Sequence, residues 1–454
     1  MKHLREHPLV TGTLILTITG LLSRIIGFFY RIYLSRLFGE EGMGIYQLLS
    51  PVLALSFSIT AAAYQTAISK MVAEAAARQK ESPFHPLLAG LSLSLPLSLI
   101  CTGIIYTLAD YIGICLLLEE RTISMLRILS FSIPLSAVHS CINGYFYGMK
   151  KTGLPAASQL LEQLVRVGSV FCIAAYARAH NVQLTINVAV AGLALGELSS
   201  MTLSVAAVYR QYTREYKQRQ NTFGLPRQSR FASHIIPLYK SILCLALPLT
   251  ANRIILNLLQ SIESVSIPSR LKSYGYDTAT ALSVYGVLTG MAMPLIFFPN
   301  ALTGSISVLL LPIISENYAL GNMAVVRRAT GRTIKYCLIL GILCLLFFVS
   351  FGKTAGIRLF DSALAGHFIT TLGFICPFLY LNTTLSGILQ GLGMTVHIFV
   401  TNVICLLLRL AFVFLSIPQA GITGYLWGLL ASQLLHSLLY LICLRRFLRG
   451  HGTV

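Results

Sequence analysis

Long apolar stretches recur along the chain and are separated by short polar breaks. Twelve of them have about 20 residues or more, the length that a helix needs to cross a bilayer. They fall at approximately 9–34, 43–68, 84–109, 122–148, 153–178, 185–209, 236–265, 279–314, 333–352, 364–390, 393–417 and 422–444. The pattern predicts an all-α polytopic membrane protein with about 12 transmembrane helices.

The composition supports this class. Hydrophobic residues make up 55% of the 454 residues and charged residues only 11%, with a mean hydropathy of +0.74. Soluble domains carry about 25% charged residues, so the bilayer must be the solvent of this chain. The ten cysteines are scattered through apolar segments without a C-x-x-C pair, which argues against a disulfide framework and a zinc site. We therefore predict no metal site.

The basic residues predict the orientation of the helices. When the helices are threaded alternately with the N-terminus inside, 21 Lys and Arg fall in cytoplasmic segments and 7 on the opposite side. This bias predicts that both termini are cytoplasmic. The net charge of +19 therefore reflects topology, and we expect no nucleic-acid partner. The first apolar stretch continues past Arg31 without an A-x-A-like cleavage site, so we expect it to be a retained helix.

A basic stretch, "YRQYTREYKQRQNTFGLPRQSRF", divides the chain into two similar halves. Four landmarks recur at an offset of 243 residues: Pro134/Pro377, Gly144/Gly387, Gly148/Gly391 and Arg166/Arg409. We predict an N-terminal six-helix lobe at 1–210, a basic cytoplasmic linker at 211–235 and a C-terminal six-helix lobe at 236–454. Repeats of six helices insert in the same orientation, and such two-lobed proteins are typically transporters.

The first helix carries two arginines, although a charge near the bilayer centre costs about 2.5–3.5 kcal/mol. Arg24 and Arg31 are seven residues apart, so both lie on nearly the same helix face. That face continues as Thr13, Thr17, Gly20, Arg24, Gly27 and Arg31. It should meet protein or a water-filled cavity. The simpler alternative is a close-packed glycine seam with Arg31 reaching the outer surface.

The first helix of the second half repeats this feature. It places Arg253, Asn257, Gln260 and Ser264 at spacings of four, three and four, with Glu263 beside them. We predict that the two polar faces line a central cavity. Such a cavity is basic and suits an anionic substrate, because a guanidinium binds phosphate oxygens well. The predicted substrate-binding residues are Arg24, Arg31, Arg253, Asn257, Gln260 and Glu263.

Four other charged residues inside apolar stretches are candidates for a secondary or ion-coupling role. Glu162 and Arg166 are four residues apart and could neutralise each other on one helix face. Arg409 has no acid on its own helix, so it pairs with another helix or joins the cavity. Glu197, in "LGELSS", could bind a coupling Na⁺ or H⁺, or accept a hydrogen bond from a neighbouring serine.

The sequence contains no H-E-x-x-H, Walker A or G-x-S-x-G motif. We therefore expect neither an enzyme nor a resident cofactor. Without a nucleotide-binding motif, transport by this chain would depend on a gradient of Na⁺ or H⁺, or on the membrane potential.

Several motifs resemble a known family. "GTLILTITGLLSRIIGFFYRIYLSRLFGEEGMGIYQLLSP", "AISKMVAEAAARQ" and "YGVLTGMAMPLIFFPNALTGSISVLLLPIISE" resemble the stage V sporulation protein B family. That family belongs to the multidrug/oligosaccharidyl-lipid/polysaccharide exporter superfamily. The resemblance implies two pseudo-symmetric lobes in a V-shaped arrangement, like that of the multidrug and toxin extrusion (MATE) exporters. It also implies alternating access and export of lipid-linked saccharides, especially peptidoglycan precursors.

"SRIIGF" also resembles the start of the related lipid II flippases. Their first-helix arginine, which is taken to contact the lipid diphosphate, corresponds to Arg24. Their next arginine corresponds to Tyr30, so Arg31 is offset by one residue. The second helix lacks their arginine, and these families usually have fourteen helices rather than twelve.

We expect a flippase of the bacterial cytoplasmic membrane that moves a polyprenyl-diphosphate-linked saccharide, such as a peptidoglycan or spore-cortex precursor. Its expected partners are this lipid, membrane lipids and cell-wall synthesis enzymes. One alternative is a cation-coupled multidrug exporter of the same superfamily, against which the arginines of the first helix argue. An alternative of another class is a non-transporting membrane scaffold for cell-wall synthesis.

Overall fold

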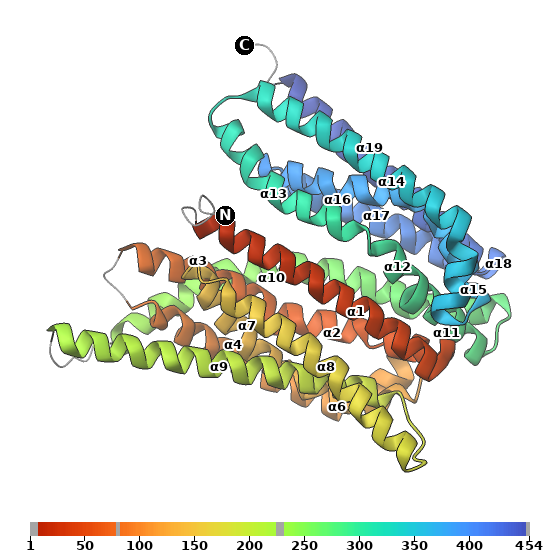
Figure 1. Ribbon diagram of the computed structural model, residues 1–454, viewed down its shortest axis with the longest axis horizontal. Helices are drawn as coiled ribbons and strands as arrows, with labels where there is room; N and C mark the ends of the chain where they lie inside the picture. Colours follow the sequence, from red (N-terminus) through yellow and green to blue (C-terminus); the bar gives the residue numbers. More distant parts are fainter. Residues whose placement is uncertain (1–7, 79–81, 224–230, 451–454) are drawn as a thin grey trace. The chain divides into compact units, whose positions relative to one another are not determined.

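The computed structural model describes residues 8–78, 82–223 and 231–450, and within these ranges every regular element is a helix (Figure 1). The N-terminal half contains α1 (Pro8–Gln47), α2 (Ser50–Phe57), η2 (Ser58–Ala62), α3 (Ala63–Arg78), α4 (Phe84–Thr107), α5 (Ala109–Tyr111), η3 (Ile112–Leu116), α6 (Thr122–Ser130), α7 (Ser132–Gly148), α8 (Gly153–Ala179) and α9 (Asn187–Phe223).

The C-terminal half contains α10 (Phe231–Tyr274), α11 (Thr278–Gly286), η4 (Val287–Ala292), α12 (Met293–Phe297), α13 (Asn300–Ala319), α14 (Met323–Phe360), α15 (Ala363–Leu372), η5 (Gly373–Ile375), α16 (Cys376–Gly391), α17 (Thr395–Leu415), α18 (Ile417–Ala420) and α19 (Ile422–Gly450). Segments η2, η3 and η4 are π-helical, and η5 is a short 3₁₀ helix.

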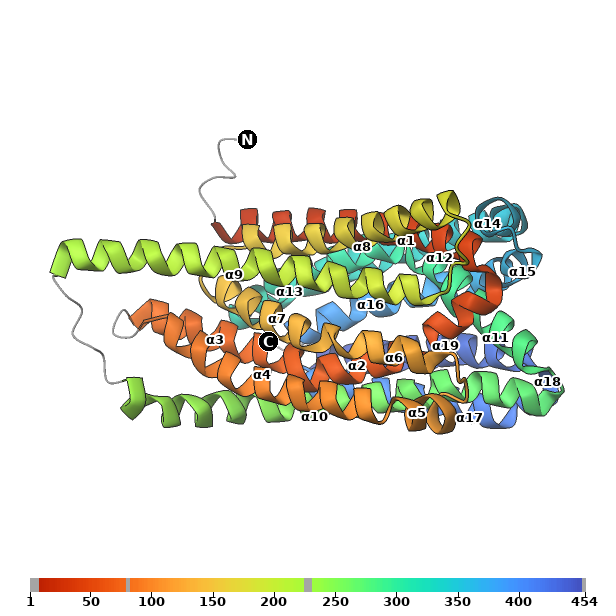
Figure 2. The same ribbon diagram turned by 90° about the horizontal axis from the view of Figure 1, so that it is seen from below.

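Twelve helical segments within the described residues are long and apolar enough to cross a membrane, which confirms the expected polytopic class. They include Leu14–Gln47 near the N-terminus and Pro237–Tyr274 at the start of the second half. Several helices run past the predicted apolar stretches because polar residues continue the same helix. Thus α14 has 38 residues, and α9 continues to Phe223 without a break (Figure 2).

The described chain forms two compact units. Unit 1 takes in Met1–Gly27 and Leu49–Asn257, and unit 2 takes in Phe28–Leu48 and Leu258–Val454. Helices α1 and α10 therefore each contribute one part to each unit. Of the predicted linker 211–235, residues 224–230 lie outside the described residues, residues 211–223 end α9, and residues 231–235 begin α10.

The C-terminal part of α1 belongs to unit 2 because it packs very closely against α11. A Cβ atom added to Gly44 would lie 2.1 Å from the carbonyl oxygen of Leu282, and one added to Gly286 would lie 2.8 Å from the Cα atom of Gly44. Only glycine allows two helix backbones to approach this closely. Within the part of α1 that belongs to unit 2 the helix also bends, since Gly39 departs from helical geometry with φ 71°.

The repeat read from the sequence corresponds to equivalent packing in the two units. In unit 1, Gly144 and Gly148 of α7 rest on the backbone carbonyls of Gln65 and Ser69 in α3. In unit 2, the corresponding glycines of α16 rest on α13, where a Cβ on Gly391 would lie 2.9 Å from the carbonyl oxygen of Leu311. The same small residues at the same offset therefore create the same helix pair in both units.

Both copies of the repeat also contain a helix break at an equivalent position. The segment Thr122–Gly148 is interrupted at Phe131, three residues before Pro134, and Ala363–Gly391 is interrupted by η5, just before Pro377. A proline has no amide hydrogen and clashes with the preceding turn, so it is tolerated in the first turn of a new helix. The two prolines therefore stand near the starts of α7 and α16.

Candidate functional site

The six predicted substrate-binding residues are divided evenly between the units. Arg24, Arg253 and Asn257 belong to unit 1, and Arg31, Gln260 and Glu263 belong to unit 2. The side chains of Arg24, Arg253 and Gln260 are exposed, whereas Glu263 is only 4% exposed. Arg31 and Asn257 are half-buried.

Arg24 and Arg253 are cations inside the apolar segments Leu14–Gln47 and Pro237–Tyr274. Neither forms an ion pair with a residue that the structure describes. A guanidinium inside a membrane-spanning segment needs an anion, a polar partner or water. The structure therefore leaves both arginines available to a ligand.

Asn257 has partners inside unit 1. Its side-chain amide donates to the carbonyl oxygen of Ala54 at 3.2 Å and to the hydroxyl of Ser58 at 2.6 Å. Ser58 begins the π-helical segment η2, and a π-turn disturbs the regular pattern of backbone hydrogen bonds. Asn257 thus connects α10 to the start of this irregular turn.

Glu263 joins a buried cluster inside unit 2. Its carboxylate accepts a hydrogen bond from the guanidinium of Arg409 on α17, and the Tyr425 hydroxyl on α19 donates to its other oxygen at 2.8 Å. Of the two alternatives for Arg409, the structure shows pairing with another helix. Both oxygens of Glu263 have partners, so its contact with substrate stays a prediction.

A second buried cluster lies in unit 1, where α8 and α9 pack closely. Gly192 and Gly196 of α9 face α8, and a Cβ on Gly196 would lie 2.8 Å from the carbonyl oxygen of Glu162. Two small residues four positions apart allow this close approach. Glu197, the next residue on α9, is thereby held beside Glu162 and Arg166.

Four ionisable side chains from three helices meet in this cluster. Glu162 and Arg166 form the ion pair that their spacing predicted, with side chains 14% and 18% exposed. His139 of α7 places its Nδ1 atom 3.1 Å from a carboxylate oxygen of Glu197. The cluster therefore contains two carboxylates, one guanidinium and one imidazole.

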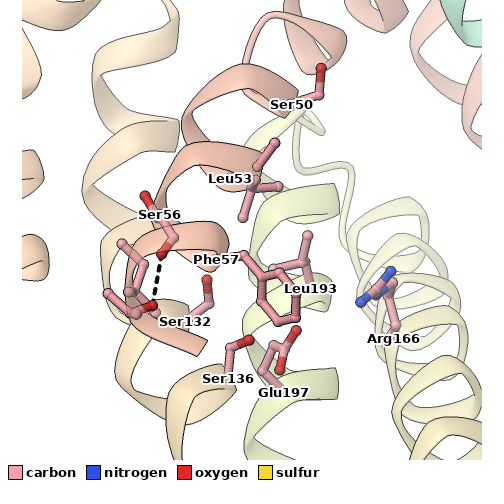
Figure 3. Close-up of a pocket in the computed structure, with 12 residues that line it drawn as sticks. Ser50, Leu53, Ser56, Phe57, Ser132, Ser136, Arg166, Leu193 and Glu197 are labelled. Atoms are coloured by element: carbon pink, nitrogen blue, oxygen red, sulfur yellow. Dashed lines mark hydrogen bonds between the residues drawn. The ribbon is translucent and has the colours of Figure 1, made fainter. Parts of the chain in front are cut away.

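A cavity of about 390 Å³ opens beside this cluster (Figure 3). Arg166 and Glu197 line it together with five hydroxyl side chains and several apolar ones, which are Ser50, Leu53, Ala54, Ser56, Phe57, Thr60, Ser132, Ile133, Ser136 and Leu193. Figure 3 shows Ser136 near the Glu197 carboxylate. Hydroxyl groups beside a buried ionic cluster make the cavity suitable for water or a small polar ligand.

Another polar cavity, of about 520 Å³, lies in unit 2, where the end of α1 meets the end of α14. The guanidinium of Arg36 donates to the carbonyl oxygens of Leu359, at 2.9 Å, and of Arg358. It therefore caps the C-terminus of α14, where a cation is favoured. These hydrogen bonds join the C-terminal part of α1 to the end of α14.

His139 and Tyr425 are the site residues that sequence reasoning missed. His139 is separated from Glu162 by one loop and from Glu197 by a further helix, and Tyr425 is 162 positions from Glu263. The one signal in the sequence is local: His139 lies in "HSCING", a polar run within an apolar segment. That run indicates a buried face but not its partners.

Comparison with known proteins places these features in context. Residues 9–318 match the family model described as polysaccharide biosynthesis protein, and residues 248–415 match that described as MatE. The chain is 28% identical over 439 residues to stage V sporulation protein B of Bacillus subtilis (strain 168), covering 96% of this chain and 83% of that protein. It is 23% identical over 454 residues to Lipid II flippase MurJ of the same organism, covering 95% and 81% respectively.

Solved structures share the fold. An inward-facing multidrug resistance MATE family transporter of the MOP superfamily aligns with a TM-score of 0.68 at 15% identity, covering 95% of this chain and 96% of that one. Lipid II flippase MurJ in an inward closed conformation aligns with a TM-score of 0.68 at 14% identity, covering 95% and 87%. These solved structures confirm the all-helical membrane fold inferred from the sequence. The family models and the curated relatives confirm the superfamily.

Proposed function

Because the chain belongs to the polysaccharide biosynthesis protein family, we propose that it is a flippase for a lipid-linked saccharide. The coarser class is a transporter of the MOP superfamily rather than an enzyme, in a bacterial membrane. The proposed substrate is a polyprenyl-diphosphate-linked saccharide, such as a peptidoglycan or spore-cortex precursor. It would be moved from the inner to the outer leaflet of the cytoplasmic membrane by alternating access.

One observation carries this proposal. Arg24 and Arg253 are exposed cations on apolar helices, and neither pairs with an acid among the described residues. A diphosphate would supply the missing negative charge and bind the guanidinium groups through paired hydrogen bonds. We therefore assign the diphosphate to Arg24 and Arg253. Arg31, seven residues from Arg24 on the same helix face, is retained as a third predicted contact.

The remaining predicted contacts are assigned according to their partners. Asn257 and Glu263 already have hydrogen-bond partners, so we assign contact with the sugar to Gln260, which is exposed. The sequence contains no nucleotide-binding motif, so an ion gradient or the membrane potential would drive the cycle. The substrate lipid and cell-wall synthesis enzymes are the proposed partners.

The test is thermal unfolding of the purified full-length protein in detergent, titrated with undecaprenyl-diphosphate-linked sugars. A ligand that binds only the folded state raises the melting temperature by mass action. We expect stabilisation in the unaltered protein, its loss in Arg24→Ala and Arg31→Ala, and its retention in Arg127→Gln. Arg127 is a matched control because its side chain is exposed and paired with Asp110.

The same experiment distinguishes the flippase from the two alternative functions, a multidrug exporter and a scaffold. The match of residues 248–415 to the MatE model favours a multidrug exporter as the second candidate. Stabilisation by cationic dyes, without any response to the diphosphate lipids, would replace the flippase by this exporter. A protein that responds to neither ligand and still captures cell-wall enzymes after Arg24→Ala would be a scaffold.

A further inference from the structure

The start of α14 and the end of α19 form a strongly basic surface of unit 2, which we call the basic patch. Seven exposed basic side chains make it up, and they are Arg327, Arg328, Arg332, Lys335, Arg445, Arg446 and Arg449. In α13, α14 and α19 together, Glu316 is the one acidic residue. None of the seven forms an ion pair with a residue that the structure describes.

The two helix ends that carry the basic patch are held together by direct contacts. The guanidinium of Arg327 donates to the carbonyl oxygen of Leu448 at 2.7 Å, so the first turns of α14 meet the last turns of α19 (Figure 1). Val326 of α14 and Leu444 of α19 also belong to one buried apolar cluster. Close packing of this kind fixes the positions of both helices. The basic side chains therefore stand on a preformed surface.

The basic side chains of each helix share one face. Arg328, Arg332 and Lys335 follow one another at spacings of four and three, and Arg445 and Arg449 are four apart. Side chains at these spacings lie above one another on one side of a helix. Like charges four residues apart repel each other, so an anion that binds between them is favoured.

The sequence of α14 gives the depth of the basic patch in the membrane. No charged residue lies between Lys335 and Lys353, an interval that is about 27 Å long at 1.5 Å per residue. The hydrocarbon core of a bilayer is about 30 Å thick, so these two lysines lie near its two edges. Arg332 and Arg328 stand up to about 10 Å beyond Lys335, at the depth of the polar headgroups. On α19, Arg445 likewise follows the apolar run.

The face of α14 that carries the cations continues into the hydrocarbon as an apolar face. Ile339, Ile342 and Leu346 follow Lys335 at spacings of four, three and four, and their side chains are 44%, 49% and 59% exposed. Cations at headgroup depth and apolar side chains below them match the two parts of a lipid. A soluble anion would match the cations alone.

The basic patch is particular to unit 2. At the offset of 243 residues that relates the two halves, the three basic positions of the α14 face correspond to His85, Ala89 and Ser92 on α4. The equivalent helix of unit 1 therefore crosses the membrane without a column of cations. The topology of the chain does not require such a column on α14.

We propose that the basic patch binds an anionic phospholipid of the bilayer, of the phosphatidylglycerol class. Its phosphate would accept hydrogen bonds from the guanidinium groups, and an acyl chain would lie along the apolar face of α14. Basic residues beside a membrane-spanning helix attract anionic lipids, and each residue adds to the affinity. The proposal is independent of the proposed function, because this lipid carries no saccharide and the patch contains none of the arginines assigned to the diphosphate.

The experiment is native mass spectrometry of the purified full-length protein, titrated with phosphatidylglycerol or with phosphatidylcholine of the same acyl chains. We expect the first phosphatidylglycerol to bind about tenfold or more tightly than the first phosphatidylcholine. The double variant Arg328→Gln, Arg332→Gln should weaken phosphatidylglycerol binding by about tenfold or more and leave phosphatidylcholine binding unchanged. The matched control is Lys353→Gln, Arg358→Gln, which removes two exposed cations from the opposite end of the same helix.

The comparison of the two lipids on the unaltered protein needs no variant to fold. Equal affinities for the two lipids would overturn the proposal. An equal loss of phosphatidylglycerol binding in both double variants would also overturn it, because the attraction would then come from the overall charge. Displacement of phosphatidylglycerol by inorganic phosphate would overturn it as well, by assigning the basic patch to a soluble anion.

Discussion

The guanidinium of Arg409 donates to the carboxylate of Glu263, although the two residues are 146 positions apart in the chain. Glu263 is 5% exposed and Arg409 20% exposed at the side chain. Removal of one partner from a buried pair leaves an uncompensated charge, which costs about 3–5 kcal/mol. We therefore expect Arg409→Met and Glu263→Gln each to lower the stability of unit 2 by an amount in this range.

The double variant provides the control for this pair. Arg409→Met combined with Glu263→Gln leaves no buried charge, so it should recover much of the stability lost in the single variants. The measurement is denaturant or thermal unfolding in detergent for all four proteins. Additive losses would show that the two side chains stabilise the unit independently.

The close contact of α1 with α11 predicts a strong difference between two glycines of the same helix. In Gly44→Ala the new Cβ would meet the carbonyl oxygen of Leu282, so we expect a loss of about 1–3 kcal/mol. Gly20 has no neighbouring atom within 4 Å of such a Cβ, and Gly20→Ala should stabilise the helix by up to about 1 kcal/mol. Equal melting temperatures for the two variants would rule out the close contact.

The cap formed by Arg36 should stabilise the end of α14. Arg36→Gln removes the charge that faces two terminal carbonyls, so the last turn of α14 should fray and lose about 1 kcal/mol, because the site is exposed and screened. Hydrogen exchange at the amides of Asp361 and Ser362, which bond back into α14, measures this directly. Arg36→Lys should restore protection only in part, since an ammonium lacks the planar fork that reaches both carbonyls.

The orientation of the chain in the membrane remains a prediction from the basic residues. We expect Glu120, in the loop before α6, to face outward and Lys151, in the loop before α8, to face the cytoplasm. Both residues are exposed, so a single cysteine at either position, in a cysteine-free background, is accessible to a membrane-impermeant maleimide. Intact cells should label the position at 120 alone. Labelling at 151 alone would reverse the topology.

Local patterns in the sequence were sufficient to predict most of the fold. The apolar stretches give twelve spans, because a span needs only about 20 apolar residues in succession. The Pro and Gly landmarks at an offset of 243 identify two equivalent helix pairs, because a close helix contact needs glycine at fixed spacing. The pair of Glu162 and Arg166 was also predictable, since residues four apart share a helix face.

The division of α1 and α10 between the units depends instead on distant contacts such as Gly44 with Leu282, which no local periodicity encodes. The two buried ionic clusters also depend on contacts between residues that are far apart in the chain. The sequence by itself determined that charges are buried in apolar helices and that each half carries an equivalent arginine. Only the tertiary structure decided that Arg409 is neutralised by Glu263 while Glu197 faces His139, because long-range packing, not spacing along the chain, brings those helices together.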